Sequence, residues 1–135
     1  MRCCFIGHSD SVGIEEKINE EVKKLLNAGI NEFYSGGMGN FDKICEKVVK
    51  ELGGRIVFVP YNISRINESD KFWYDEIICP FGNKKYYNSD IPKRNQWLVD
   101  NCEFCLCNVY KEGGAKRTYD YAIKKKKFII NISEK

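Results

Sequence analysis

Short hydrophobic runs alternate along the chain with hydrophobic residues at helical spacing. The first run ends at Gly7, and the apolar positions that follow recur every three or four residues, at Ile14, Ile18, Val22, Leu25 and Leu26. A continuous run predicts a buried strand, and the helical spacing predicts an amphipathic helix. Gly29 is placed to end that helix, because glycine readily takes the left-handed conformation of a helix terminus.

The same alternation continues through most of the remaining sequence. Periodicity and turn residues predict strands over 31–35, 55–59, 103–110 and 128–132, and helices over 41–52, 90–101 and 118–126. Such alternation is typical of a mostly parallel central sheet covered by helices on both faces. We therefore expect a single three-layer α/β domain that spans residues 1–135.

Residues 61–89 interrupt this alternation. They combine polar with aromatic side chains, among them Trp73 and Tyr74, and predict only one short strand, over 77–79. We interpret the segment as an insertion or lid beside the core. Its aromatic residues either pack on the core or offer faces on which a base can stack.

Composition narrows the classes of partner. The net charge of +3, from 22 basic and 19 acidic residues, is far from the concentrated basic surface of a dedicated nucleic-acid binder, so nucleic acid is not an expected partner. No apolar run approaches the length of a membrane span, and the first is too short for a signal peptide. Seven cysteines without a regular framework favour reduced thiols. These features predict a cytoplasmic protein with no membrane partner.

The cysteines could also suggest a metal site. Cys102, Cys105 and Cys107 lie close in sequence, but the last two would share one buried face of a strand. His8 is the only histidine, and no second cluster of cysteines accompanies these three. We therefore predict no metal site, and free cysteines packed as small apolar side chains.

Candidate binding residues gather where the predicted strands end, because open parallel sheets bind ligands beyond the carboxyl ends of their strands. Four turns lie there: Gly7-His8-Ser9, Ser35 to Gly39, Pro92 to Asn95, and Gly113-Gly114-Ala115. In the second turn, glycines let the backbone approach a ligand, with amides that point outward as a phosphate site. The alternative is a tight turn that needs positive φ angles. Hydride transfer and ATP hydrolysis lack their usual signatures, so no cofactor is expected.

These turns resemble motifs of the SLOG superfamily, the Rossmann-like group that includes the DprA/Smf proteins and the LOG-type nucleotide phosphoribohydrolases. The segment Ser35-Gly36-Gly37-Met38-Gly39-Asn40-Phe41-Asp42 is similar to its Ser-Gly-x-Ala-x-Gly-Ile/Phe-Asp signature. Three further pieces agree in order and spacing: the opening strand into Gly7-His8, the helix with Arg94-Asn95, and Gly113-Gly114-Ala115-x-x-Thr118. The resemblance covers the chain except for residues 61–89.

The resemblance implies that a nucleotide, or a molecule derived from one, lies across the strand ends. It places phosphate contacts on the loop from Ser35 to Gly39 and on the Gly113-Gly114 turn, with Ala115 and Thr118 beside them. Arg94 is the expected cation, since guanidinium binds phosphate with two parallel hydrogen bonds, although it would also suit a solvent-facing helix. Asn95 would orient a ribose or base edge, or simply start the helix.

Asp42 and His8 each have a functional and a structural interpretation. Asp42 lies in the first turn of its helix, where a carboxylate either contacts the ligand or only complements the helix dipole. His8 either contacts phosphate or exchanges a proton near neutral pH, or it bonds to the backbone of its own turn.

The motifs support binding better than catalysis. The LOG-type hydrolases carry Pro-Gly-Gly-x-Gly-Thr closely followed by a glutamate, whereas this chain lacks the proline and the third glycine. Its nearest acids are Glu112 and Asp120, which are candidate catalytic residues for cleaving the glycosidic bond of a nucleoside monophosphate. We expect a module that binds a nucleotide-like small molecule. The alternative is a hydrolase, and a third hypothesis is a domain that acts through partner proteins. Related members often assemble, so a homo-oligomer is expected.

Overall fold

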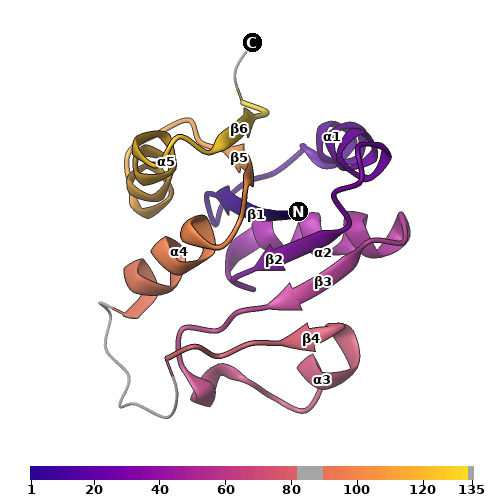
Figure 1. Cartoon of the computed structure of the whole chain (residues 1–135), viewed down its shortest axis with the longest axis vertical. Helices are drawn as coiled ribbons and strands as arrows, with labels where there is room; N and C mark the ends of the chain where they lie inside the picture. Colours follow the sequence, from indigo (N-terminus) through magenta and orange to yellow (C-terminus); the bar gives the residue numbers. More distant parts are fainter. Residues whose placement is uncertain (82–89, 134–135) are drawn as a thin grey trace.

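Six parallel strands form one sheet in the computed structural model, which describes residues 1–81 and 90–133 (Figure 1). The strand order is β4-β3-β2-β1-β5-β6, so β1 lies in the middle between β2 and β5. The strands are β1 Arg2–Gly7, β2 Glu32–Ser35, β3 Arg55–Phe58, β4 Glu76–Ile77, β5 Phe104–Asn108 and β6 Phe128–Asn131. Because all of them run in parallel, their carboxyl ends meet at one edge of the sheet.

Helices cover both faces of this sheet and complete three layers (Figure 1). The helices are α1 Glu15–Asn27, α2 Gly39–Glu51, α3 Asp70–Trp73, α4 Asp90–Asp100 and α5 Gly114–Lys124, with a 3₁₀ turn, η1, at Ile63–Arg65. On one face α1 packs against α2, and on the other α4 packs against α5. The predicted α/β fold with helices on both faces is confirmed, and the described strands are all parallel.

The central strand divides its side chains between two cores. Cys3 and Phe5 point into the core beneath α1 and α2, whereas Cys4 and Ile6 point into the core beneath α4 and α5. This alternation follows from the period of two in a β-strand. Both faces are buried, so the strand carries a continuous apolar run rather than an alternating one.

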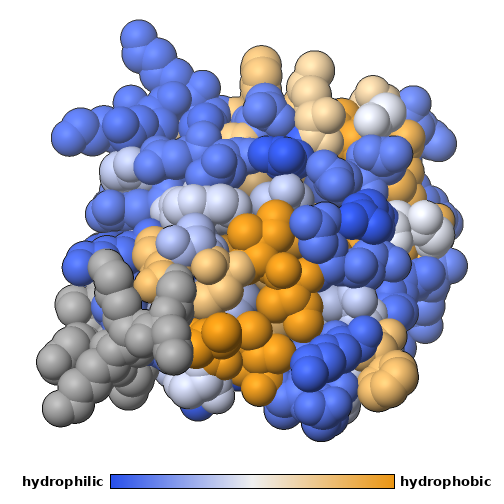
Figure 2. Space-filling view, turned by 60° about the horizontal axis from the view of Figure 1, so that its bottom comes forward, coloured by the Kyte–Doolittle hydropathy of each residue, from blue (hydrophilic) through white to orange (hydrophobic). Residues whose placement is uncertain are grey.

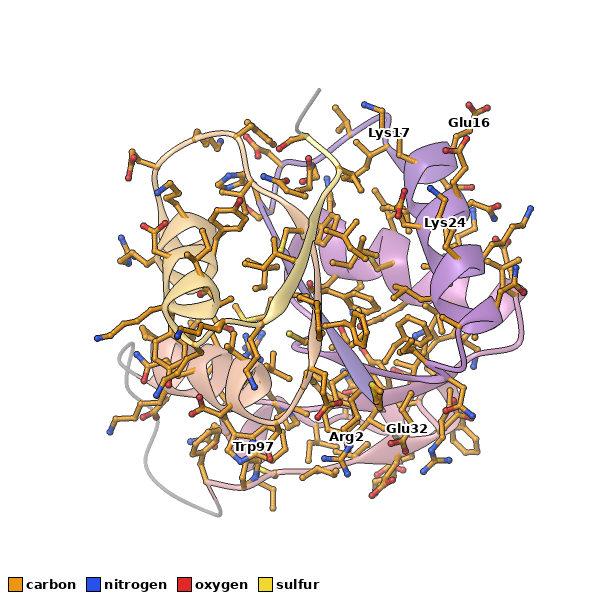
Figure 3. The ribbon with its side chains drawn as sticks, turned by 45° about the horizontal axis from the view of Figure 1, so that its top comes forward. Arg2, Glu16, Lys17, Lys24, Glu32 and Trp97 are labelled. Atoms are coloured by element: carbon orange, nitrogen blue, oxygen red, sulfur yellow. The ribbon has the colours of Figure 1, made fainter. Side chains whose placement is uncertain are left out.

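Charged residues begin four neighbouring strands at the amino edge of the sheet. Arg2 pairs with Glu32 and Glu32 with Arg55, both at 3.4 Å, and Arg55 pairs with Glu76 at 2.6 Å. Figure 3 shows Arg2 and Glu32 side by side at this edge. Each pair is partly exposed and contributes little alone, but the alternating signs match the observed strand register.

The observed strands and long helices agree with the predicted ones to within four residues at each end, whereas α3 and η1 were not predicted. Helix α5 begins at Gly114, four residues before the predicted start, because Gly113 at φ 138° ends the turn sooner. The strand predicted over 77–79 is observed one residue earlier and shorter, as β4 over Glu76–Ile77, which pairs in parallel with β3 and forms the edge of the sheet. The idea of a lid over 61–89 stays a prediction, and its residues 82–89 lie outside the described part.

The end of the molecule that carries α3 and β4 is mixed in polarity. Figure 2 shows hydrophobic residues gathered near the middle of this end, with hydrophilic residues around them. Among residues 1–81 and 90–133, no helix is both long and apolar enough to cross a membrane.

Candidate functional site

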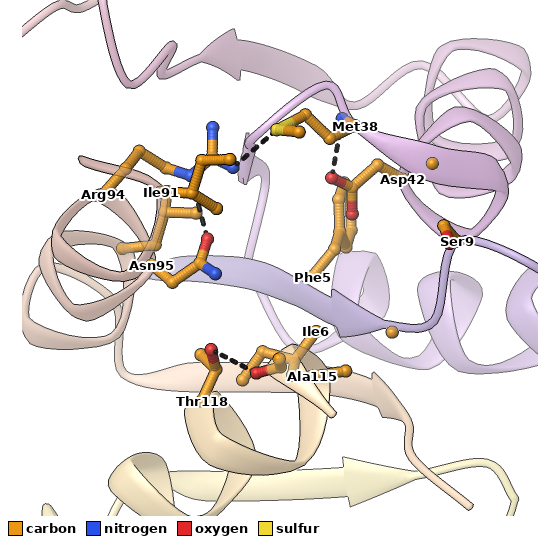
Figure 4. Close-up of a pocket in the computed structure, with 14 residues that line it drawn as sticks. Phe5, Ile6, Ser9, Met38, Asp42, Ile91, Arg94, Asn95, Ala115 and Thr118 are labelled. Carbon is orange, nitrogen blue, oxygen red and sulfur yellow. Dashed lines mark hydrogen bonds between the residues drawn. The ribbon is translucent and has the colours of Figure 1, made fainter. Parts of the chain in front are cut away.

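A pocket of about 210 Å³ opens at the carboxyl edge of the sheet (Figure 4). It lies between the amino-terminal ends of α2 and α5, with the end of β1 as its floor and α4 as one wall. The residues that line it are Phe5, Ile6, Gly7, Ser9, Met38, Gly39, Asp42, Ile91, Arg94, Asn95, Leu98, Gly114, Ala115 and Thr118. The pocket therefore lies where ligands bind in open parallel sheets.

The structure brings most of the predicted binding residues into this pocket and leaves some outside it. Those that line it are Gly7, Met38, Gly39, Asp42, Arg94, Asn95, Gly114, Ala115 and Thr118. Gly36 and Gly37 line a separate pocket of about 190 Å³ on the other side of their loop. Residues that line neither are His8, Ser35, Glu112, Gly113 and Asp120.

Close packing explains two of the glycines in the pocket. A side chain on Gly7 would overlap the ring of Phe41, so glycine lets α2 approach the end of β1. Gly39 has a φ of 80°, and a side chain there would lie 2.8 Å from the Cα atom of Ser9. The amide of Asn40 donates a hydrogen bond to the Ser9 carbonyl at 3.0 Å. These glycines thus join the two loops that form the mouth of the pocket.

The amides of the glycine-rich loop are directed inward, which differs from the prediction. The amide of Gly37 donates to Ser35 Oγ at 3.0 Å, and the amide of Met38 donates to Asp42 Oδ2 at 3.1 Å. The Asp42 carboxyl group thereby takes the place that a ligand phosphate was expected to fill at the start of α2. The positive φ of 66° at Gly37 supports the alternative of a turn that requires glycine.

A buried carboxylate, Glu46, holds this loop from below. Its side chain is 1% exposed, and Ser35 Oγ donates to its Oε2 at 2.5 Å. Tyr74 Oη donates to the same oxygen at 2.9 Å, and Trp73 Nε1 donates to Oε1 at 3.2 Å. Sequence reasoning missed Glu46, although it stands four residues after Asp42 on an otherwise apolar helix face.

Arg94 reaches the loop but uses its donors there. The guanidinium is 2% exposed, and Nη1 donates to the carbonyls of Gly36 and Val59, both at 3.0 Å. Nε donates to Asn95 Oδ1 at 2.9 Å, and Nη2 contacts Met38 Sδ at 3.3 Å. Four of its five N–H groups are therefore occupied. Arg94 connects the loop to α4 and to Val59, the residue after β3, and its expected contact with phosphate stays a prediction.

Asp42 is the only carboxyl group among the residues that line the pocket. Burial raises its pKa from an ordinary 3.8 to about 7, against the lowering effects of the Met38 hydrogen bond and the Arg94 charge. A nearby Glu46 charge adds to the rise. The group can therefore hold or release a proton at neutral pH.

The first turn of α5 has free backbone donors, and its residues Gly114 and Ala115 line the site. The first bond of this helix runs from the Arg117 amide to the Gly113 carbonyl, so the amides of residues 114–116 precede the helical ladder. A methyl group on Gly114 would meet nothing closer than Arg117 Nη2 at 3.8 Å, which leaves the backbone accessible. Sequence reasoning did not assign a role to Arg117, although it lies inside the quoted motif.

A third pocket, of about 320 Å³, continues from the first along α4 and α5. The first and third pockets share Ile91, Asn95, Gly114 and Thr118, and the third adds Arg117 and Tyr121 among its lining residues. We call the two together the α4–α5 groove. The start of α5 lies at its middle, and Asp42 lies at one end.

The remaining predicted residues have other partners. His8 is 6% exposed; its Nε2 accepts a hydrogen bond from the Tyr110 amide at 3.3 Å, and burial lowers its pKa, with a further contribution from Lys111. Asp120 is exposed and accepts from Lys116 Nζ at 2.7 Å. Glu112 is exposed as well. Neither acid lines the pockets that form the groove.

The seven cysteines, all within the described residues, form no disulfide, and most are buried. Within the described residues, no three His, Cys, Asp or Glu side chains gather in a way that could hold a metal ion.

Comparison with known proteins gives matches in structure but not in sequence. No protein-family model and no curated protein matches the chain. DNA processing protein A (DprA) of Streptococcus pneumoniae matches with a TM-score of 0.74 at 15% identity, over 95% of this chain and 48% of that one. DprA of Helicobacter pylori matches with a TM-score of 0.75 at 13% identity, over 96% and 63%.

A third match is the molybdenum cofactor carrier protein of Chlamydomonas reinhardtii. Its TM-score is 0.68 at 17% identity, over 99% of this chain and 77% of that one. The chain spans about half of the Streptococcus protein and most of the carrier. At these identities the likeness concerns the fold. The chain has the Rossmann-like α/β fold that these proteins share, as the resemblance to the SLOG superfamily implied.

Proposed function

We propose that the chain binds a phosphate-bearing, nucleotide-like small molecule in the α4–α5 groove, with the phosphate at the first turn of α5. The observation that carries this proposal is the start of α5: the amides of residues 114–116 precede its helical bonds, and Gly114 and Ala115 line the groove together with Arg117. A helix amino terminus favours negative charge through its dipole and its unpaired N–H groups.

The cation in this proposal is Arg117 rather than Arg94. The guanidinium of Arg117 lines the groove, is exposed, and makes no hydrogen bond or ion pair with the described residues. Arg94, in contrast, is buried, and Gly36 and Val59 already accept from it. A cation with free donors can bind phosphate at no cost to the loop.

The structural neighbours support a small molecule as the ligand, and they also make nucleic acid a second candidate partner. The Chlamydomonas protein carries the molybdenum cofactor, whereas the Helicobacter protein binds single-stranded DNA. The expectation that nucleic acid is no partner therefore stays a prediction without support from these neighbours. Homo-oligomer formation and a cytoplasmic location also stay predictions.

The test is calorimetric titration with AMP, 3′,5′-cyclic AMP and NAD, compared with adenosine as the form without phosphate. We expect at least one phosphate-bearing compound to bind, and Arg117→Ala to weaken it roughly tenfold, or about 1.4 kcal/mol, as for one charged hydrogen bond. Lys17→Ala is the control, because Lys17 is an exposed cation on α1, remote from α5 in Figure 3. Equal affinity of adenosine and AMP would contradict the phosphate site.

Hydrolysis of an N-glycosidic bond is the second candidate function, and Asp42 favours it. An acid that assists the departure of a base must lie in the pocket, and Asp42 does so with a pKa of about 7. Asp120 and Glu112, the acids expected from the sequence, lie outside. Release of free adenine from AMP, measured by chromatography and abolished in Asp42→Asn but not in Asp120→Asn, would establish this activity.

A further inference from the structure

Asp42 presents one carboxyl oxygen to the protein and the other to the pocket. Oδ2 accepts the Met38 amide, and Oδ1 has no hydrogen bond with the described residues. Among the described residues, every fully buried side-chain nitrogen or oxygen has a hydrogen-bond partner. Because Oδ1 has none, it is not fully buried, and it is accessible from the pocket that Asp42 lines. Figure 4 shows the carboxyl group between Met38 and Phe5, facing the open space.

The surroundings of this oxygen disfavour a negative charge. Asp42 is 8% exposed, and Phe5, Ile91 and Leu98 supply apolar walls. No cation of the described residues lies within ion-pair distance of the Asp42 carboxyl group. The guanidinium of Arg94 instead donates to backbone carbonyls and to Met38. The titratable and charged groups that face Asp42 are Arg94 from α4, Lys43, Cys45 and Glu46 from α2, and Tyr74 from the segment after α3.

The neighbouring carboxylate on α2 is better suited to carry the charge. Glu46 lies one turn after Asp42 and accepts hydrogen bonds from Ser35, Tyr74 and Trp73. Two buried carboxylates on adjacent turns repel each other when both are ionised. The one with three donors is the better site for the negative charge, and the one with a single donor is the better site for the proton.

We propose that Asp42 meets its ligand as a neutral carboxyl group and donates a hydrogen bond from Oδ1 to an oxygen acceptor of that ligand. This inference rests on the proposed function and names the specificity of the same site. Asp42 selects a ligand whose inner end carries an acceptor, a sugar or phosphate oxygen, and disfavours one whose inner end only donates, such as an amino group.

Ligand binding then depends on the protonation of one group. Burial raises the pKa of Asp42 to about 7, and a bound phosphate would raise it further through its negative charge. If only the neutral form binds, the dissociation constant increases about tenfold between pH 6 and pH 8, since the neutral fraction falls by that factor. Affinity is therefore highest below the pKa and is lost as the pH rises through it.

The experiment measures the dissociation constants of 3′,5′-cyclic AMP, cyclic GMP and NAD at pH 6 and pH 8 by calorimetry. The charge of these phosphodiesters and of the pyrophosphate is constant over this range, so the protein alone titrates. Asp42→Asn keeps both the acceptor for Met38 and a permanent donor, and it should bind at both pH values with the affinity of the unmodified protein at pH 6. Asp120→Asn removes an exposed carboxylate outside the groove and should retain the tenfold dependence.

Each outcome separates the inference from the proposed function. Tight binding that is equal at pH 6 and pH 8 in the unmodified protein leaves the proposed function in place and overturns the donor role of Asp42. A tenfold loss that persists in Asp42→Asn overturns it as well, because another group would then titrate. Failure of all three compounds to bind at either pH overturns the proposed function, and the donor role with it.

Discussion

The free energy of unfolding should depend on pH through Asp42 even without a ligand. The carboxyl group has a pKa of about 7 in the folded protein and an ordinary 3.8 when exposed, so the folded state binds more protons between these values. Stability therefore falls as the pH rises through this window. The full effect is about 4 kcal/mol, from about 1.4 kcal/mol per tenfold change over roughly three pH units, and somewhat more than half of it falls between pH 5 and pH 8.

Urea denaturation of the protein and of Asp42→Asn at pH 5, 6, 7 and 8 measures this term. Other groups titrate as well, but they are common to both proteins and cancel in the difference. We expect the variant to gain stability relative to the parent by about 2–3 kcal/mol over this range. The Asn side chain is uncharged and can still accept the Met38 amide, so its own stability lacks the Asp42 term.

Asp120→Asn serves as the control, because that carboxylate is exposed and paired with Lys116 at the surface. Its stability curve should run parallel to that of the parent. The reasoning is refuted if the curve of Asp42→Asn also runs parallel, since Asp42 would then titrate alike in the folded and unfolded states.

Two further substitutions test the packing of the pocket. Gly7→Ala should destabilise the protein by about 3 kcal/mol, because a methyl group would overlap Phe41, and a melting temperature within a degree of the parent would contradict this contact. Arg94→Ala should lower the free energy of unfolding by about 2–4 kcal/mol in urea denaturation, because the carbonyls of Gly36 and Val59 lose a buried donor. A variant as stable as the parent but unable to bind nucleotide would instead show that Arg94 serves the ligand alone.

The hydrophobic pattern was sufficient for the fold. The run from Cys3 to Gly7 has no polar residue to mark an exposed face, and it forms the central strand with both faces buried. The start of α5 was placed too late, because Gly113 and Gly114 have low helix propensity and no apolar periodicity precedes Thr118. The conformation of Gly113 decides that boundary, and periodicity carries no information about it.

Individual roles in the site were harder to predict than its location. Arg94 and Asp42 were expected to contact ligand, and both line the pocket, but their partners within the protein depend on long-range contacts with Val59 and with the shape of the loop. Glu46 lies on the face of α2 that reads as apolar, where a carboxylate is only tolerated if donors from distant segments reach it. Tyr74 is such a donor, and no residue close to Glu46 in the sequence indicates that it would contact Glu46.

The hydrogen bonds on Glu46 have a consequence for how the pocket recognises its occupant. Ser35, Trp73 and Tyr74 all donate to the one carboxylate and thereby connect the end of β2 to α3 and to the residue that follows it. These bonds hold the loop whose residues Met38 and Gly39 line the pocket, so association need not spend free energy on ordering that loop. On this side the binding site is preorganised, so the shape of the ligand, rather than a rearrangement of the loop, sets the selectivity.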